Sequence, residues 1–94
     1  MRENVETLPK RVSMSDILAK VVNTEYHLLP GTTTTICHIT LQNGFIILGQ
    51  SACVDPGEYN QALGEKYAFE DAIDKIWQLE GYLLAERRYQ AALK

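Results

Sequence analysis

The chain has 94 residues, of which 46% are hydrophobic and 22% are charged. This length suits one domain over residues 1–94 with a modest core, and the apolar content excludes a disordered protein. The net charge of −3 gives no general attraction to nucleic acid polymers or to anionic membranes, so neither is expected as a partner. No apolar run approaches the roughly 20 residues that span a bilayer, and residues 1–12 hold no apolar signal segment. We therefore expect a cytoplasmic protein.

The N-terminal part of the chain predicts an arm followed by a short helix. Residues 1–12 are polar and are expected to form the arm. Ser13 and Asp16 have the spacing of a capping box, in which a hydroxyl and a later acid satisfy the first backbone groups of a helix. The apolar residues that follow recur at helical spacing: Ile17, Leu18, Val21 and Val22. This pattern predicts a helix over residues 15–23.

The middle of the chain predicts a β-sheet. Residues 25–29 precede Pro30-Gly31, a dipeptide typical of type II turns, and are expected to form a first strand. Residues 32–55 contain two alternating apolar and polar runs on either side of Asn43-Gly44. Asn-Gly suits a two-residue type I′ turn, because both residues tolerate positive φ. The segment therefore predicts a three-stranded antiparallel meander.

The predicted two-residue turn sets the pairing of the hairpin. Leu41 would lie opposite Ile46, and Ile39 opposite Leu48. Because side chains alternate between the faces of a strand, this register assigns each residue to a face. The expected core face carries Cys37, Ile39, Leu41, Ile46 and Leu48. The other face carries Ile36, His38, Thr40, Phe45 and Ile47.

The C-terminal part is helical in composition from about Tyr59 onward. Its apolar residues recur every three or four positions: Phe69, Ala72, Ile73, Ile76, Leu83 and Leu84. We expect this stripe to cross the apolar face of the sheet, with a kink or break at Gly81. The predicted fold class is α+β, with a short N-terminal helix, the meander, and a long C-terminal helix or helical pair on one face. The exposed sheet edges favour self-association as a homo-oligomer.

Catalytic and metal-binding motifs are weak. A structural zinc needs about four ligands, and only His27 and His38 could join Cys37 and Cys53, so we expect free thiols, no metal and no cofactor. An enzyme could use Cys53 with His38 as a nucleophile pair. It could also use acids of the long helix as general acid and base, namely Glu65, Glu70, Asp71 and Asp74. The alternative for Cys53 is a thiol packed in the core, and the alternative for the acids is the solvent-exposed face of an amphipathic helix. We expect a non-catalytic protein.

Cations and aromatic residues suggest a binding function. Guanidinium groups bind phosphate in a bidentate manner, and aromatic rings stack on bases. The expected ligand-binding residues are Arg11, Arg87 and Arg88 for phosphate and Tyr59 for stacking, at a site between subunits. The alternative is a solvated helix end with exposed cations and half-buried tyrosines.

Four motifs together resemble a family of small proteins from tailed phages and prophages. They are RVS at residues 11–13, NGF at 43–45, GQSACVDP at 49–56 and KIWQLEGY at 75–82. The chain also resembles the Thoeris anti-defence sponges, small oligomeric phage proteins that sequester cyclic nucleotide-type immune signals without cleaving them. The resemblance implies a counter-defence protein of the host cell cytoplasm that binds a small nucleotide signal. The alternative is an interaction module that binds a host protein through its sheet edge or helix.

Overall fold

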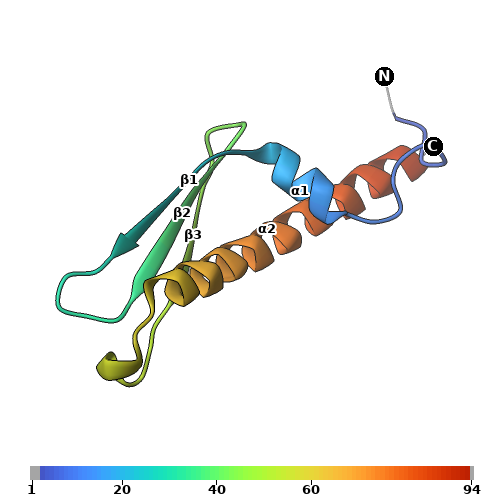
Figure 1. Cartoon of the computed structure of the whole chain (residues 1–94). Coiled ribbons are helices and arrows are strands. Elements are labelled where there is room, and N and C mark those ends of the chain that lie inside the picture. The colour runs from blue at the N-terminus through green and yellow to red at the C-terminus, as the bar shows by residue number, and fades with distance from the viewer. Residues whose placement is uncertain (1–2, 94) are drawn as a thin grey trace.

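The structure is a computed structural model that describes residues 3–93. Its elements follow in the order α1 (Met14–Lys20), β1 (Val21–Leu28), β2 (Thr35–Leu41), β3 (Ile46–Ser51), the 3-10 turn η1 (Pro56–Glu58) and α2 (Gln61–Ala92). The long helix α2 runs along the sheet and continues beyond it, where α1 and the arm lie beside it (Figure 1). The α+β class predicted from the sequence is confirmed.

The three strands form one antiparallel sheet in the order β1-β2-β3. The backbone N–H of Thr32 donates to the carbonyl of Leu29 at 3.1 Å, and Gly31 has a φ of 74°. A hydrogen bond across four residues with positive φ at the third is the pattern of a type II turn. The predicted turn at Pro30-Gly31 is therefore confirmed.

The second turn differs from the prediction. The N–H of Leu41 donates to the carbonyl of Phe45, and the N–H of Gly44 donates to the carbonyl of Leu41, both at 2.9 Å. Among the residues described, positive φ is confined to glycines, so Asn43 lacks the conformation that a type I′ turn requires. The connection has three residues, with Gly44 at a φ of 86° in the left-handed position. The predicted type I′ turn is wrong.

The longer turn shifts the predicted pairing by one residue and reverses the faces of β3. Ile39 lies opposite Ile47, and Cys37 lies opposite Gly49. Ile47 is therefore in the core, whereas Ile46 and Leu48, which were expected there, are 44% and 52% exposed. The assignment of β2 to its faces is confirmed, because Cys37, Ile39 and Leu41 are all buried.

Helix α1 begins as predicted and ends earlier. The side chain of Ser13 accepts from the N–H of Asp16 at 3.1 Å, and the Asp16 carboxylate accepts from the N–H of Ser13 at 3.0 Å, which confirms the capping box. The helix ends at Lys20, because Val21 already pairs with Leu41 in the sheet. The predicted helix over residues 15–23 was too long, since β-branched valines also suit a strand.

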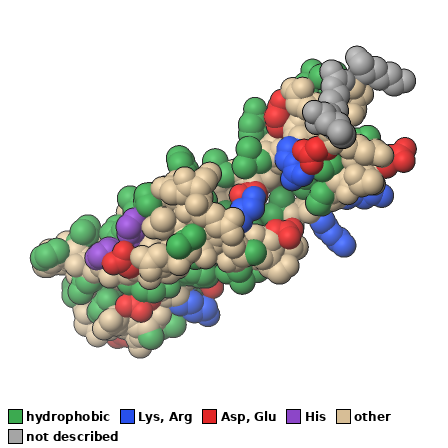
Figure 2. All heavy atoms as spheres, turned by 90° about the horizontal axis from the view of Figure 1, so that it is seen from above, with side chains coloured by type: hydrophobic (Ala, Val, Ile, Leu, Met, Phe, Trp, Pro, Cys, Tyr) green, Lys and Arg blue, Asp and Glu red, His purple; other side chains and the backbone are tan. Residues whose placement is uncertain are grey.

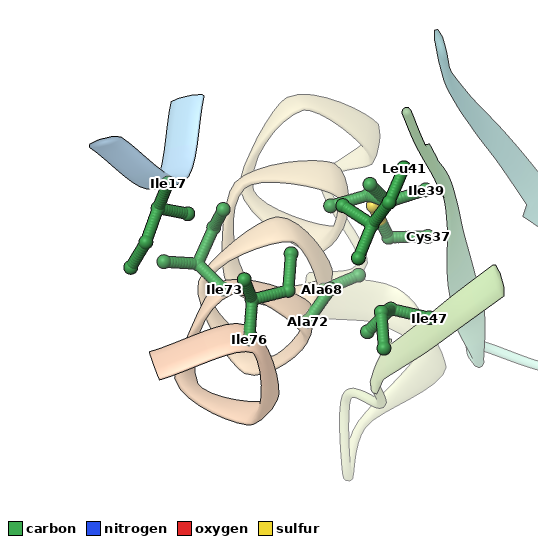
Figure 3. Packing of buried hydrophobic residues seen from close by; sticks show 9 residues of the cluster. All are labelled: Ile17, Cys37, Ile39, Leu41, Ile47, Ala68, Ala72, Ile73 and Ile76. Carbon is green, nitrogen blue, oxygen red and sulfur yellow. The ribbon is translucent and has the colours of Figure 1, made fainter. Parts of the chain in front are cut away.

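Helix α2 is continuous over 32 residues and passes through Gly81, so the helix neither ends nor restarts there. It lies between the sheet and α1, and Ile17 of α1 approaches it from the side opposite to the sheet (Figure 3). The core cluster comprises Ile17, Cys37, Ile39, Leu41, Ile47, Ala68, Ala72, Ile73 and Ile76. Over residues 3–93, none of the helices has the length and apolar character needed to cross a membrane.

Candidate functional site

The arm before α1 is held against the C-terminal part of α2 by Arg88. One terminal nitrogen of Arg88, Nη1, donates to the backbone carbonyls of Val5, Leu8 and Pro9 at 3.5, 3.3 and 2.9 Å. The side chain of Leu8 is buried. Arg88 was expected to bind phosphate, with an exposed cation at the helix end as the alternative. The structure instead gives it a role in fixing the arm, with its other nitrogens left for further contacts.

Arg87 binds the arm through an acid. Its Nε and Nη2 donate to the two carboxylate oxygens of Glu3 at 3.1 and 2.6 Å. These hydrogen bonds hold the pKa of Glu3 below its usual range. The bidentate geometry is the one in which a guanidinium also binds phosphate. Glu3 therefore occupies a position on Arg87 that suits an anion.

A groove opens between the arm and α2. We call it the arm groove. The groove has two adjoining parts, with cavity volumes of about 340 and 440 Å³. The part of about 440 Å³, called the larger part below, is lined by Lys10, Arg11, Val12, Gly81, Leu84, Ala85 and Arg88. Three of these residues are cations, the other four are apolar or glycine, and no acidic side chain is among them. The larger part thus combines positive charge with an apolar floor.

The smaller part of the arm groove shares Arg11 with the larger part and has mixed charge. It adds Lys20 and Arg87, together with the acids Asp16 and Glu80. Both acids are engaged, since Lys20 pairs with Glu80 at 2.6 Å and Asp16 caps α1. The Lys20–Glu80 pair therefore joins α1 to α2, whereas Asp16 acts within α1.

Arg11 and Lys10 are the cations of the arm groove whose side chains have no protein partner within residues 3–93. Both are exposed, and within residues 3–93 neither forms a hydrogen bond or an ion pair through its side chain. Several lysine and arginine side chains gather on the end of the molecule that carries the arm, whereas the two histidines lie together at the other end (Figure 2). An anion that enters the groove would meet Arg11 and Lys10 without displacing a protein partner.

Tyr59 lies at the opposite end of α2 from the arginines. Its hydroxyl is 3.4 Å from the hydroxyl of Thr35, and its ring packs near Gly64. The intervening turns of α2 rise by about 1.5 Å per residue, which separates Tyr59 from Arg88 by roughly 40 Å. Arg11, Arg87 and Arg88 thus come together, but Tyr59 does not join them within one chain.

The residues considered for catalysis have separate surroundings. The Cys53 thiol donates to the carbonyl of Asp55 at 3.1 Å, whereas Nδ1 of His38 lies 3.7 Å from the Glu25 carboxylate. Both cysteines are free thiols, and Cys37 is buried as expected while Cys53 is partly exposed. Within residues 3–93, no group of three or more histidine, cysteine or acidic side chains is placed to hold a metal ion.

Residues 12–88 match the model of the Phage protein (N4 Gp49/phage Sf6 gene 66) family. The chain belongs to this family. Family membership agrees with the phage resemblance of the sequence motifs, and the matched segment includes Tyr59, Arg87 and Arg88. Lys10 and Arg11 precede the match, so the family relationship does not address these two cations. A search of curated proteins and a search of solved structures each found no match.

The arginines that line the arm groove could be selected from the sequence, but its apolar lining residues, such as Val12 and Leu84, could not. From the sequence, Val12 is part of the RVS motif, Leu84 belongs to the stripe expected to cross the sheet, and Gly81 is the expected site of a kink or break. Gly81 in fact leaves open space beside the helix, because nothing lies within 4 Å of the position that a Cβ atom would take. The available signal was a pair of cations, Lys10 and Arg11, directly before an apolar residue in the arm.

Proposed function

We propose that this phage protein is a non-catalytic counter-defence protein that sequesters a small cyclic nucleotide immune signal in the arm groove. The observation that carries the proposal is the lining of the larger cavity. It sets Lys10, Arg11 and Arg88 around an apolar floor, without an acidic residue among the lining side chains. A cyclic nucleotide has the matching chemistry, since it joins anionic phosphates to flat bases whose faces can pack on apolar side chains.

Each part of the arm groove has a role in this proposal. Arg11 and Lys10 would bind phosphate directly, because neither side chain forms an ion pair within residues 3–93. Arg88 would contribute a nitrogen that the arm carbonyls leave unused. Val12 and Leu84 would contact the base. The cavity of about 440 Å³ is within the usual range for a small-molecule site.

The resemblance to the Thoeris anti-defence sponges supports a role against host immunity, and the match to a phage protein family agrees with a phage origin of the chain. A sponge needs only to bind its signal and keep it from the host receptor. The arm groove suits that role, because it offers cations beside apolar surface. The alternative function, a module that binds a host protein, requires no such groove.

The direct test is calorimetric titration with a panel of cyclic dinucleotides, cyclic trinucleotides and cyclic ADP-ribose isomers. At least one compound should bind saturably, and heating should release it chemically unchanged. Arg11→Ala should weaken binding by about 10–100-fold, the equivalent of one or two hydrogen bonds to a charged group.

A matched control is Lys66→Ala. Lys66 is an exposed cation near the start of α2, 5.7 Å from the ring of Tyr67 and outside the arm groove. This variant should bind as the parent does. Absence of binding to the whole panel, equal losses in both variants, or recovery of a cleaved nucleotide would each contradict the proposal.

A further inference from the structure

Side chains of α2 cover the backbone groups at one edge of the sheet, the β3 edge. At the β3 edge, the N–H of Gln50 donates to the Asp71 carboxylate at 2.9 Å, and Nζ of Lys75 donates to the carbonyl of Leu48 at 2.6 Å. Two neighbouring side chains of α2 therefore cover the outward backbone groups of β3. Such covering is a common way to prevent an edge strand from pairing with another chain.

The β1 edge has no such cover. The N–H of Leu29 donates to the carbonyl of Thr34 at 3.0 Å, and because hydrogen-bonded pairs alternate in an antiparallel ladder, the backbone groups of Thr24, Tyr26 and Leu28 point away from β2. No hydrogen bond to these outward groups is formed by the residues that the structure describes. The edge is therefore open along most of β1.

The helix also leaves the side chains of this strand uncovered. Helix α2 packs mainly on β2 and β3. Tyr26 and Leu28 lie on the helix side of the sheet, yet they are 36% and 49% exposed. A strand added to β1 would satisfy the open backbone groups and bring new side chains against these two.

We propose that the β1 edge binds a second copy of this chain, in an antiparallel pair with Tyr26 opposite Tyr26 of the partner subunit. In this register, Glu25 lies opposite His27 of the partner subunit, and the two-fold axis repeats the pair. The facing charges are complementary whenever the imidazole is protonated, and they remain a donor and an acceptor otherwise. The two sheets then form one continuous sheet with an α2 helix on each half.

Charge disfavours the neighbouring register that is centred on Glu25. If the partner were shifted by two residues, Glu25 would face Glu25 of the partner subunit, and like charges directly opposite destabilise a strand pair. Within its own chain, Glu25 accepts from the Asn23 side chain at 3.1 Å and lies 3.7 Å from His38. The His27 ring is 6.4 Å from that of His38. These groups form a mixed polar face beside the axis, and none of them repels the proposed pairing.

The oligomeric state tests the surface. Sedimentation velocity should show a dimer of the unmodified chain, and Tyr26→Lys should convert it to a monomer because two ammonium groups would meet at the axis. Tyr82→Lys is the matched control, since Tyr82 is an exposed aromatic residue on α2, away from β1, and this variant should remain dimeric. Circular dichroism should report the same helix content for all three proteins. A monomeric parent, or a Tyr26→Lys dimer, would overturn the proposal.

Disulfide formation tests the register independently of stability. Glu25 and His27 of the partner subunit would form a pair without backbone hydrogen bonds, with Cα atoms about 4.5 Å apart, which a disulfide can bridge. In a Cys53→Ser background, a mixture of the Glu25→Cys and His27→Cys proteins should therefore cross-link under mild oxidation. Each protein alone should cross-link far more slowly. Equal cross-linking of Glu25→Cys with itself would overturn the proposed register.

Discussion

Gly49 of β3 lies directly against Ala72 of α2, with no space between the two backbones for a side chain. A methyl group on Gly49 would overlap the backbone nitrogen of Ala72 and the carbonyl oxygen of Ala68. Both of these alanines are fully buried. The glycine and the two alanines together set how closely α2 approaches the sheet.

Gly49→Ala should therefore destabilise the protein markedly. Overpacking in a core typically costs about 1–3 kcal/mol, and here the obstruction is backbone, which moves less easily than a side chain. Urea denaturation measures the loss. The control is Gly57→Ala, because its added methyl would lie 3.4 Å from the Asp55 carboxylate, an ordinary contact. If both variants unfold at the same urea concentration as the parent, the helix does not pack on β3 as described.

Gly81→Ala should have the opposite effect. Gly81 lies inside a continuous helix, and a Cβ atom there would meet nothing within 4 Å. Alanine is favoured over glycine in a helix interior by about 0.8–1 kcal/mol. Thermal and chemical unfolding should both show a gain of roughly this size. A loss of stability would indicate that the helix requires a break at Gly81.

The sheet illustrates what the sequence could and could not predict. The strands and their order followed from turn residues and alternation, but the register of β3 did not. Asn43-Gly44 fits either a two-residue or a three-residue turn, and three consecutive apolar residues from Ile46 to Leu48 give no alternation to choose between them. The choice depends on the fit of Gly49 under α2, a contact between residues far apart in the chain.

The candidate site shows a similar limit. Residue chemistry was enough to select Arg11, Arg87 and Arg88, which the fold brings to one end. It could not show that Arg88 would bind arm carbonyls, because those contacts depend on how the arm folds back along α2. Nor could it show that Tyr59 lies just before the far end of the same helix, since a kink or break was expected at Gly81.

The two cysteines should differ in reactivity. Cys37 is completely buried, whereas Cys53 is partly exposed, so a thiol reagent should modify Cys53 rapidly and Cys37 only on unfolding. Cys53→Ser should remove the fast phase. Two fast phases would mean that the core around Cys37 is open.

Alkaline pH should destabilise the protein through Cys37. Burial raises the pKa of its thiol above the ordinary value of 9.0, so the unfolded chain loses this proton more readily than the folded chain. The contribution to stability is complete below pH 9.0 and is lost as the pH rises beyond it. Urea unfolding across this range should show a falling free energy, and a constant value would contradict the burial of Cys37.

Arg88→Ala should release the arm. The substitution removes the donor that binds the carbonyls of Leu8 and Pro9, and trypsin should then cut after Lys10 and Arg11 much faster than in the parent. Lys66→Ala, which removes a distant cation, should leave the rate of arm cleavage unchanged. Equal rates in all three proteins would show that Arg88 does not hold the arm.

Native mass spectrometry of protein purified from signal-producing cells tests the central claim most directly, because it reports the retained ligand and the subunit number in one spectrum. We expect a dimer that carries an added mass of nucleotide size, and heating should release that compound intact. Protein with Arg11→Ala, prepared in the same way, should lose most of the added mass and remain dimeric. Bare protein from these cells, or an equal added mass on the Arg11→Ala variant, would contradict nucleotide binding in the arm groove.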